Sequence, residues 1–250
     1  MNFAYCLVSI SPLRAEAKDA SEMVSQLLFG EPVHILEERS PWVKIETMLD
    51  GYQGFADIKH FRALTEKEMK RWIDGKALVS TQTCSIDTPW GTQQLVRGAF
   101  ITSERTQTFS IGNDQFSFIE NPKVLNWKSP VETALSYLNS PYLWGGKSPF
   151  GIDCSGLTQT VLRFFDINLP RDASQQVECG REISFEEKEP GDLAFFNNTA
   201  GKIIHVGFCG NDHDFIHASG RVRVDRLTLE GIINNETGEL THYLHSIRRM

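Results

Sequence analysis

Short apolar segments alternate with turn residues over the first sixty positions of the chain. The apolar segments include residues 33–36, 42–45 and 52–55, and turn-forming pairs such as Ser40-Pro41 and Asp50-Gly51 separate them. Turn signals about ten residues apart between β-rich segments are typical of a small barrel or sandwich. The pattern therefore predicts a first all-β domain over residues 1–62.

A capping box follows this domain. Thr65 and Glu68 have the types and spacing with which a hydroxyl and a carboxylate satisfy free amides at a helix start, and this predicts a helix to about Asp74. Short β-like segments then return between residues 76 and 120, and Asn121-Pro122-Lys123 has the composition of a boundary. We predict a second domain over residues 63–122, made of a short helix and a small β module.

The last part of the chain has a different pattern. Ser129, Pro130 and Glu132 form a strong helix start, and a second helix is expected from near Cys154 to about residues 168–170. Apolar segments between residues 193 and 224 are separated by Asn, Gly and Asp turns and predict antiparallel strands. Helices followed by a meander indicate an α+β domain over residues 123–250.

Composition and charge exclude several classes of protein. The 250 residues include 40% hydrophobic side chains, without the 18 to 20 consecutive apolar residues that a membrane-spanning helix requires. Lys and Arg number 25 against 32 Asp and Glu, a net charge of -7 that argues against a nucleic-acid partner. We expect a globular protein without a membrane span.

Five cysteines are spread along the chain, at positions 6, 84, 154, 179 and 209. Their odd number and wide spacing favour free thiols in a reducing compartment, and Cys154 apart we expect them to be buried and inert. The first residues lack a basic leader, so we expect a cytoplasmic protein. A periplasmic or wall-associated location is the alternative if a signal peptide has been removed.

Cys154 stands at the expected start of a helix, where free amides and the helix dipole favour a thiolate. A small buried hydrophobe is the more common role of a cysteine considered alone. His205 and His217 lie in two apolar segments joined by a turn, and neighbouring strands lie roughly 5 Å apart. One imidazole could then act as a base on Cys154 while the other orients it, although each histidine alone is more often a core residue.

Several motifs surround these three residues in a fixed order. They are Tyr142 with Trp144, Gly145 and Gly146; Asp153-Cys154-Ser155-Gly156; Leu169-Pro170-Arg171-Asp172; Pro190-Gly191-Asp192-Leu193; His205-Val206-Gly207; and His217-Ala218-Ser219. Over about residues 125–250 this set resembles the NlpC family of papain-like cell-wall cysteine peptidases.

The resemblance implies a role for each of four residues. Cys154 is the nucleophile, His205 the general base and His217 the residue that orients the base. The hydroxyl of Tyr142 would lie beside the reacting carbonyl and could form an oxyanion site with the amide of Cys154. A turn aromatic packed on Trp144 is the alternative role of Tyr142.

The N-terminal half is similar to two bacterial Src-homology-3-type modules. Residues 21–31 and 50–55 resemble the first module of the γ-D-glutamyl-L-diamino acid endopeptidases, a subgroup that recycles murein peptides. The resemblance implies that Asp153, Ser155 and Tyr52 contribute to reading the free amine of an N-terminal L-Ala. A glutamate of the module also takes part in that subgroup, but Val24 occupies the best-aligned position. Glu22, two residues earlier and so expected on the same strand face, is assigned instead.

The resemblance thus implies an α+β, papain-like NlpC catalytic domain preceded by two small all-β Src-homology-3-like barrels. The expected protein is a monomeric endopeptidase that needs no cofactor and cleaves murein peptides such as L-Ala-γ-D-Glu followed by meso-diaminopimelate or lysine. A hydrolase of intact wall and an inactive peptide-binding protein are the alternatives. Asp153 could also be a helix N-cap. The set of His205, Cys209, His213 and His217 lacks the close pairs of a zinc site, so no metal is expected.

Overall fold

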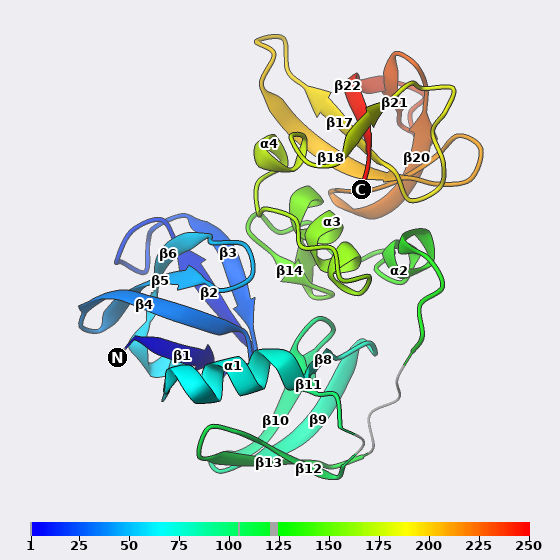
Figure 1. The fold of residues 1–250 in the computed structure, drawn as a ribbon. Coiled ribbons are helices and arrows are strands. Elements are labelled where there is room, and N and C mark those ends of the chain that lie inside the picture. Colours follow the sequence, from blue (N-terminus) through cyan, green and yellow to red (C-terminus); the bar gives the residue numbers. More distant parts are fainter. Residues whose placement is uncertain (1, 105, 121–124) are drawn as a thin grey trace. The chain divides into compact units, whose positions relative to one another are not determined.

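The computed structural model describes residues 2–104, 106–120 and 125–250 (Figure 1). The chain forms two compact units: Met1–Asn126 with Lys147–Pro149, and Trp127–Gly146 with Phe150–Met250. The boundary predicted at Asn121-Pro122-Lys123 lies outside the described residues.

The first β module of unit 1 is a seven-stranded sheet with the strand order β3-β2-β6-β5-β4-β1-β7. Apolar side chains that alternate along these strands, such as Leu27, Val33 and Ile45, form a buried core, as the pattern of the sequence predicts. The elements are β1 (Phe3–Cys6), β2 (Ile10–Arg14), β3 (Met23–Leu28), β4 (Pro32–Arg39), β5 (Trp42–Thr47), β6 (Gln53–Asp57), a short 3-10 helix η1 (Ile58–His60) and β7 (Phe61–Leu64).

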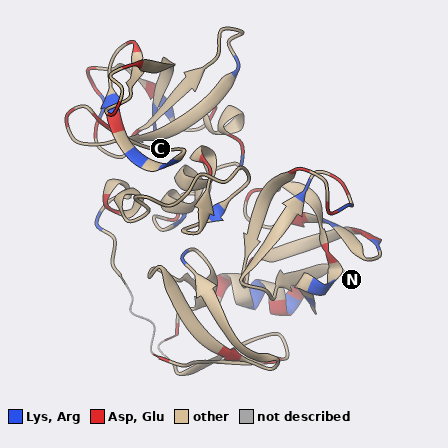
Figure 2. Ribbon diagram, turned by 180° about the vertical axis from the view of Figure 1, so that it is seen from behind, with Lys and Arg blue, Asp and Glu red and all other residues tan. Residues whose placement is uncertain are grey.

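Helix α1 (Glu66–Gly75) begins at the predicted capping box, where Thr65 accepts a hydrogen bond from the Glu68 amide and Glu68 accepts one from the Thr65 amide. Acidic and basic residues alternate along its exposed surface (Figure 2). The buried face carries Trp72, whose indole N–H donates to the Gly30 carbonyl at 2.7 Å. The helix is therefore fixed to the first module by its one large aromatic side chain.

A second β module follows α1, as predicted. It consists of a four-stranded sheet, β10-β9-β13-β12, and a two-stranded sheet, β11-β8. One hydrophobic cluster contains Tyr5 and Phe29 of the first module together with Phe109 and Phe116 of the second, so the two modules share a core. The strands are β8 (Lys76–Leu78), β9 (Thr83–Thr88), β10 (Gly91–Val96), β11 (Phe100–Thr102), β12 (Thr108–Ile111) and β13 (Asp114–Phe118); β14 (Lys147–Ser148) also belongs to unit 1.

Unit 2 contains three helices among its described residues: α2 (Pro130–Leu135), α3 (Cys154–Arg163) and α4 (Ala173–Gln176). Ser129 caps α2, as predicted. The prediction for the end of α3 is wrong, because the helix stops at Arg163 rather than near residue 168. Asp166 takes a left-handed φ of 58°, and the Ile167 amide bonds back to the Leu162 carbonyl, which closes the helix.

The strands of unit 2 form an antiparallel sheet in the order β16-β22-β17-β18-β19-β20-β21, and β22 also pairs with β21. This second pairing closes six strands into a barrel. Helix α3 lies against β18 and β19, where Leu157 and Val161 join a buried cluster with Val206 and Ile216 (Figure 1). The strands are β15 (Gly151–Ile152), β16 (Arg181–Ile183), β17 (Leu193–Asn197), β18 (Ile203–Cys209), β19 (Asp214–Ser219), β20 (Arg221–Leu227), β21 (Gly231–Ile233) and β22 (Leu240–Arg249).

Candidate active site

Cys154 is the first residue of α3, the position predicted for it. Asp153 is the N-cap and accepts a hydrogen bond from the Gly156 amide at 2.7 Å. Position 156 requires glycine for a steric reason, because the Cβ of any other residue would lie 2.2 Å from the Gly146 carbonyl oxygen. The start of α3 therefore packs directly on the Gly145-Gly146 loop, and the sulfur of Cys154 is held at a fixed place.

The Cys154 thiol is buried, with 6% of the residue exposed. Burial, and next the charge of Asp153, raise the pKa of the thiol to about 12, although the Ser155 and Val206 amides hydrogen-bond to the sulfur and act in the opposite direction. The expectation of a thiolate at rest is therefore wrong, because desolvation outweighs the helix-terminal amides. An attack by Cys154 needs a base that removes its proton.

His205 and His217 lie on adjacent antiparallel strands, β18 and β19, as predicted. Nε2 of His205 is 2.7 Å from Nδ1 of His217, and both rings are buried. The Val206 amide that bonds to the Cys154 sulfur belongs to the residue directly after His205. The described residues contain no hydrogen bond between that sulfur and the His205 ring, so the catalytic pairing of these two groups stays a prediction.

The sequence analysis missed a fourth residue of this group, Asp225 of β20. Its Oδ2 is 3.0 Å from Nε2 of His217, and the residue is 2% exposed. Ser219 pairs with Arg221 across Gly220, so the strands β19 and β20 form a tight hairpin in which residues 217, 223 and 225 share a face. The glycine turn and the strand alternation are the sequence signals that could have identified Asp225.

A third histidine lies against His205. The His242 ring, from β22, stacks on the His205 ring with centroids 4.6 Å apart and planes inclined by 27°. Burial, and next the neighbouring His217 and His242, hold the pKa of His205 well below its usual value. Within the described residues, no group of three or more His, Cys, Asp or Glu side chains is arranged to hold a metal ion.

The low pKa of His205, the predicted base, determines the pH below which activity is expected to be lost. A base works only in its neutral form, so lowering the pKa of His205 moves the loss of activity to lower pH. His217 and His242 are the titratable groups that act on it, and both also have lowered pKa values, while Asp225 lies beyond His217. We expect kcat/KM to stay flat from pH ~7.5 to ~6.5 and to fall only below that range. A pH profile on protein shown by circular dichroism to remain folded checks this; an acid midpoint above 6.5 would contradict it.

Tyr142 lies close to the nucleophile. Burial raises the pKa of the phenol to about 12, and the charges that Cys154 and Asp153 carry when ionised act in the same direction. Its amide donates to the Gly220 carbonyl at 3.0 Å, and the residue forms a bridge with Ile152, two residues before Cys154. The phenol is thus neutral at physiological pH and can donate a hydrogen bond.

Asp153 is paired with an arginine that the sequence motif contains but to which we assigned no role. Arg171 donates to Oδ1 of Asp153 at 3.1 Å, to Oδ2 at 2.6 Å and to the Ser155 hydroxyl at 2.8 Å. The Gly145 amide donates to Oδ2 at 2.7 Å. The alternative role of Asp153 as a helix N-cap is therefore confirmed, and its carboxylate is also the acceptor of a buried bidentate ion pair.

The two remaining predicted residues belong to unit 1. Tyr52 is half-buried and packs against the core of the first module. Glu22 is exposed and precedes β3 by one residue. A bulge places Val24 between the residues that pair with Leu13 and Arg14, so the inference that Glu22 and Val24 share a strand face does not hold. Their roles in substrate binding stay predictions.

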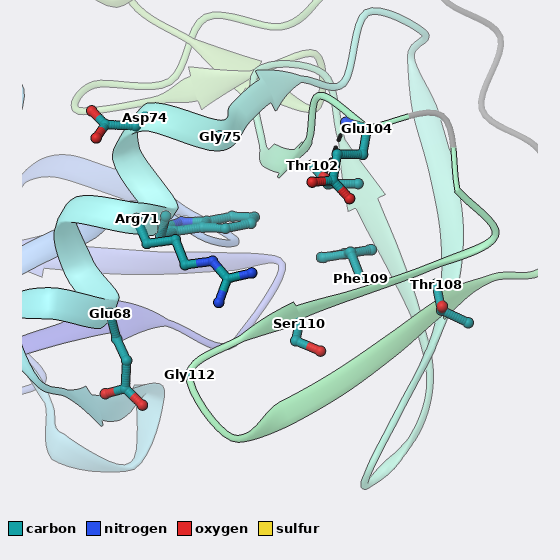
Figure 3. A pocket seen from close by; sticks show the side chains of 11 residues that line it. Glu68, Arg71, Asp74, Gly75, Thr102, Glu104, Thr108, Phe109, Ser110 and Gly112 are labelled. Atoms are coloured by element: carbon teal, nitrogen blue, oxygen red, sulfur yellow. Dashed lines mark hydrogen bonds between the residues drawn. The ribbon is translucent and has the colours of Figure 1, made fainter.

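Unit 1 also contains a cavity of about 930 Å³ between α1 and the second β module. Figure 3 shows Arg71 and Glu68 reaching from the helix, with Phe109 and Ser110 on the strand opposite them. The described residues that line it include neither cysteine nor histidine, so they offer no thiol–imidazole pair. The predicted catalytic residues Cys154, His205 and His217 lie instead on α3, β18 and β19.

The cysteines other than Cys154 differ in their surroundings. Cys6, Cys84 and Cys209 are buried, as expected, whereas Cys179 is half-buried, and all five thiols are free. The prediction of a buried Cys179 is therefore wrong: this residue follows the short helix α4 and packs against the edge of the core, where it is only partly covered.

Comparison with protein families gives two matches. The profile of the NlpC/P60 family matches residues 139–240, which include Cys154, His205 and His217. The profile of the bacterial dipeptidyl-peptidase Sh3 domain matches residues 13–61, the first β module.

Relatives with similar sequences extend these matches over most of the chain. Dipeptidyl-peptidase 6 of Lysinibacillus sphaericus is 30% identical over 249 residues, which cover 86% of this chain and 87% of that protein. Gamma-D-glutamyl-L-lysine dipeptidyl-peptidase of Bacillus cereus is 25% identical, over 88% of this chain and 75% of that protein. A crystal structure of an NlpC/P60 family protein from Bacillus cereus has a TM-score of 0.80 at 20% identity and covers 99% of both chains, which shows a shared fold.

Proposed function

Because this chain belongs to the NlpC/P60 family of cysteine peptidases, we propose that it cleaves the γ-D-glutamyl-diamino acid bond of murein peptides with a free N-terminal L-Ala. The family confirms the predicted enzyme class and the predicted fold, a papain-like α+β domain preceded by Src-homology-3-type β modules. One observation carries the proposal: similarity to dipeptidyl-peptidases that runs through both units, since such enzymes remove two residues and must read a free amine.

In the proposed mechanism the Cys154 sulfur attacks the γ-carbonyl carbon of D-Glu. The thiol proton passes to Nδ1 of His205, because Nε2 of that ring is already bonded to His217. The carbonyl oxygen becomes an oxyanion that accepts hydrogen bonds from the Tyr142 hydroxyl and the Cys154 amide, which has no acceptor within the first turn of α3.

The intermediate then collapses. The bond between the carbonyl carbon and the amine nitrogen breaks, and the imidazolium of His205 gives its proton to the departing diamino acid. A water molecule attacks the remaining thioester, with His205 again acting as the base. The product dipeptide leaves as a carboxylic acid, and the Cys154 thiol is restored.

We assign the reading of the substrate amine to Ser155, Tyr52 and Glu22, with Asp153 in a supporting role. The two oxygens of Asp153 already accept hydrogen bonds from Arg171, Gly145 and Gly156. Asp153 therefore contributes by fixing Arg171 and the first turn of α3, on which Ser155 lies. A free amine is distinguished from an acylated one because the acyl group would leave acceptors unpaired.

Two substrates test the proposal. We expect the protein to release diaminopimelate from L-Ala-γ-D-Glu-diaminopimelate and to release it at least ~100-fold more slowly from the N-acetylated peptide, the size of effect seen when buried polar groups lose their partner. Release is measured by chromatography, with the lysine analogue run in parallel. Equal rates would remove the reading of the amine and leave the peptidase intact, whereas activity on intact sacculi would favour the alternative of a wall hydrolase.

We further propose that the protein is cytoplasmic and monomeric. Its five free cysteines fit a reducing compartment, which is the observation that supports the location. As a separate finding, none of the described helices has the length and apolarity of a membrane span. Fractionation of cells that express the full chain, followed by size-exclusion chromatography with light scattering, tests both statements; recovery in the periplasm or a dimeric mass would overturn one or the other.

A further inference from the structure

Asp225 lies behind the two histidines, and its two oxygens have different partners. Oδ1 accepts hydrogen bonds from the Arg223 guanidinium at 2.9 Å and from the Asn235 amide at 2.9 Å. Oδ2 faces Nε2 of His217 at 3.0 Å. The carboxylate is thus held on one side by two donors and presents its other oxygen to the ring.

This arrangement determines which nitrogen carries hydrogen in the rings of His217 and His205. Oδ2 of an ionised Asp225 can only accept, so Nε2 of His217 must carry hydrogen. In a neutral imidazole the other nitrogen is then an acceptor, and His217 Nδ1 accepts from His205 Nε2 at 2.7 Å. His205 is therefore protonated on Nε2, and its Nδ1 has the free lone pair that a base needs.

We propose that Asp225 is a positioning residue, which selects the tautomer of His205 through His217 and stabilises the imidazolium that forms when His205 takes the thiol proton. This inference rests on the proposed role of His205 as the base. The opposite tautomer would aim a lone pair of His217 at the carboxylate and place hydrogen on His205 Nδ1, which could not then accept the proton of Cys154.

The charges around Asp225 agree with this role. Burial would raise the pKa of Asp225, but hydrogen bonds from His217, the Asn235 amide and Arg223 lower it to about 2. The residue is thus a carboxylate at neutral pH. Arg223, its cationic neighbour, is also paired with Glu236 at 3.1 Å and hydrogen-bonded to Asn234 at 3.2 Å.

The variant Asp225→Asn keeps the shape of the side chain but reverses the direction of the hydrogen bonds that run from residue 225 through His217 to His205. Arg223 and the Asn235 amide require the amide oxygen at the Oδ1 position, so the NH₂ group takes the Oδ2 position and donates to His217. His205 is then driven to the Nδ1-protonated tautomer. We expect kcat to fall by about 100- to 10,000-fold, where the upper limit is the roughly 10,000-fold loss caused by the same change directly beside the base of a serine protease triad, with KM changed by less than about threefold.

Glu236→Gln is the matched control, since it makes the same change from carboxylate to amide in another partner of Arg223. Its kcat should stay within about twofold of the unchanged protein. An Asp225→Asn enzyme with a comparable kcat and an unchanged melting temperature would overturn the proposal.

A second measurement needs no variant and no activity. In ¹⁵N-labelled protein the imidazole nitrogen shifts report which nitrogen carries hydrogen, and we expect hydrogen on Nε2 of both His205 and His217. Hydrogen on Nδ1 of either ring would overturn the role of Asp225 even in an active enzyme. An inactive protein with the expected tautomers would instead refute the proposed function.

Discussion

Replacing Cys154 by alanine is expected to abolish the release of diamino acid from L-Ala-γ-D-Glu-diaminopimelate. The substitution removes the atom that attacks the γ-carbonyl carbon in the first step of the proposed mechanism, so the thioester on which water acts cannot form. Loss of a nucleophile of this kind lowers kcat by about a millionfold. A discontinuous chromatographic assay with long incubation measures the residual rate.

Cys209→Ala provides the matched control in the same unit. Cys209 is the last residue of β18, is buried, and burial raises the pKa of its thiol to about 12, as for Cys154. It lies in the cluster with Phe196 and Phe215, away from the start of α3. We expect near-normal activity in this variant. If Cys154→Ala retained even a hundredth of the original rate, another group would have to be the nucleophile.

The elements that position the site follow from local signals. Ser129 and Thr65 are helix caps whose partners lie three residues away, so the sequence reveals them before any tertiary contact forms. The start of α3 at Cys154 depends in the same way on Asp153 and Gly156. The pairing of β18 with β19 was predictable from one short turn. Each of these contacts spans only a few residues of chain.

The predictions that failed depend on longer-range or competing interactions. The apolar spacing of Phe164 and Phe165 continues the helical pattern, but the left-handed Asp166 ends the helix earlier. A thiolate at Cys154 follows from helix electrostatics alone, and burial reverses it. Glu22 was placed by strand alternation that a bulge interrupts.

Two partners of predicted residues were missed for the same reason. Arg171 meets Asp153 across 18 residues of chain, and Asp225 meets His217 only after β19 and β20 adopt their register. A sequence motif shows that such residues are present. The contact that gives each of them its role forms only when the elements pack together. The catalytic side chains were thus easier to identify than the groups that hold them.

The second large effect is expected from Arg171→Met. Asp153 and Arg171 are only 4% and 2% exposed, so the variant leaves a buried carboxylate without its cation. Removing one partner of a buried pair costs about 3–5 kcal/mol in the free energy of unfolding. For a unit of this size that corresponds to a fall of roughly 10–20 °C in melting temperature. Scanning calorimetry checks this, since it can separate the transitions of the two units.

Two further variants separate charge from packing. Arg221→Met removes an exposed pair with Glu236 in the same unit and should change the melting temperature little. The double variant Asp153→Asn/Arg171→Met removes both buried charges and should recover a large part of the stability, since the cost lies in the unpaired carboxylate. If the double variant were instead less stable than Arg171→Met by the full effect of a second independent loss, Arg171 would stabilise the unit through its packing and its bond to Ser155, and not through Asp153.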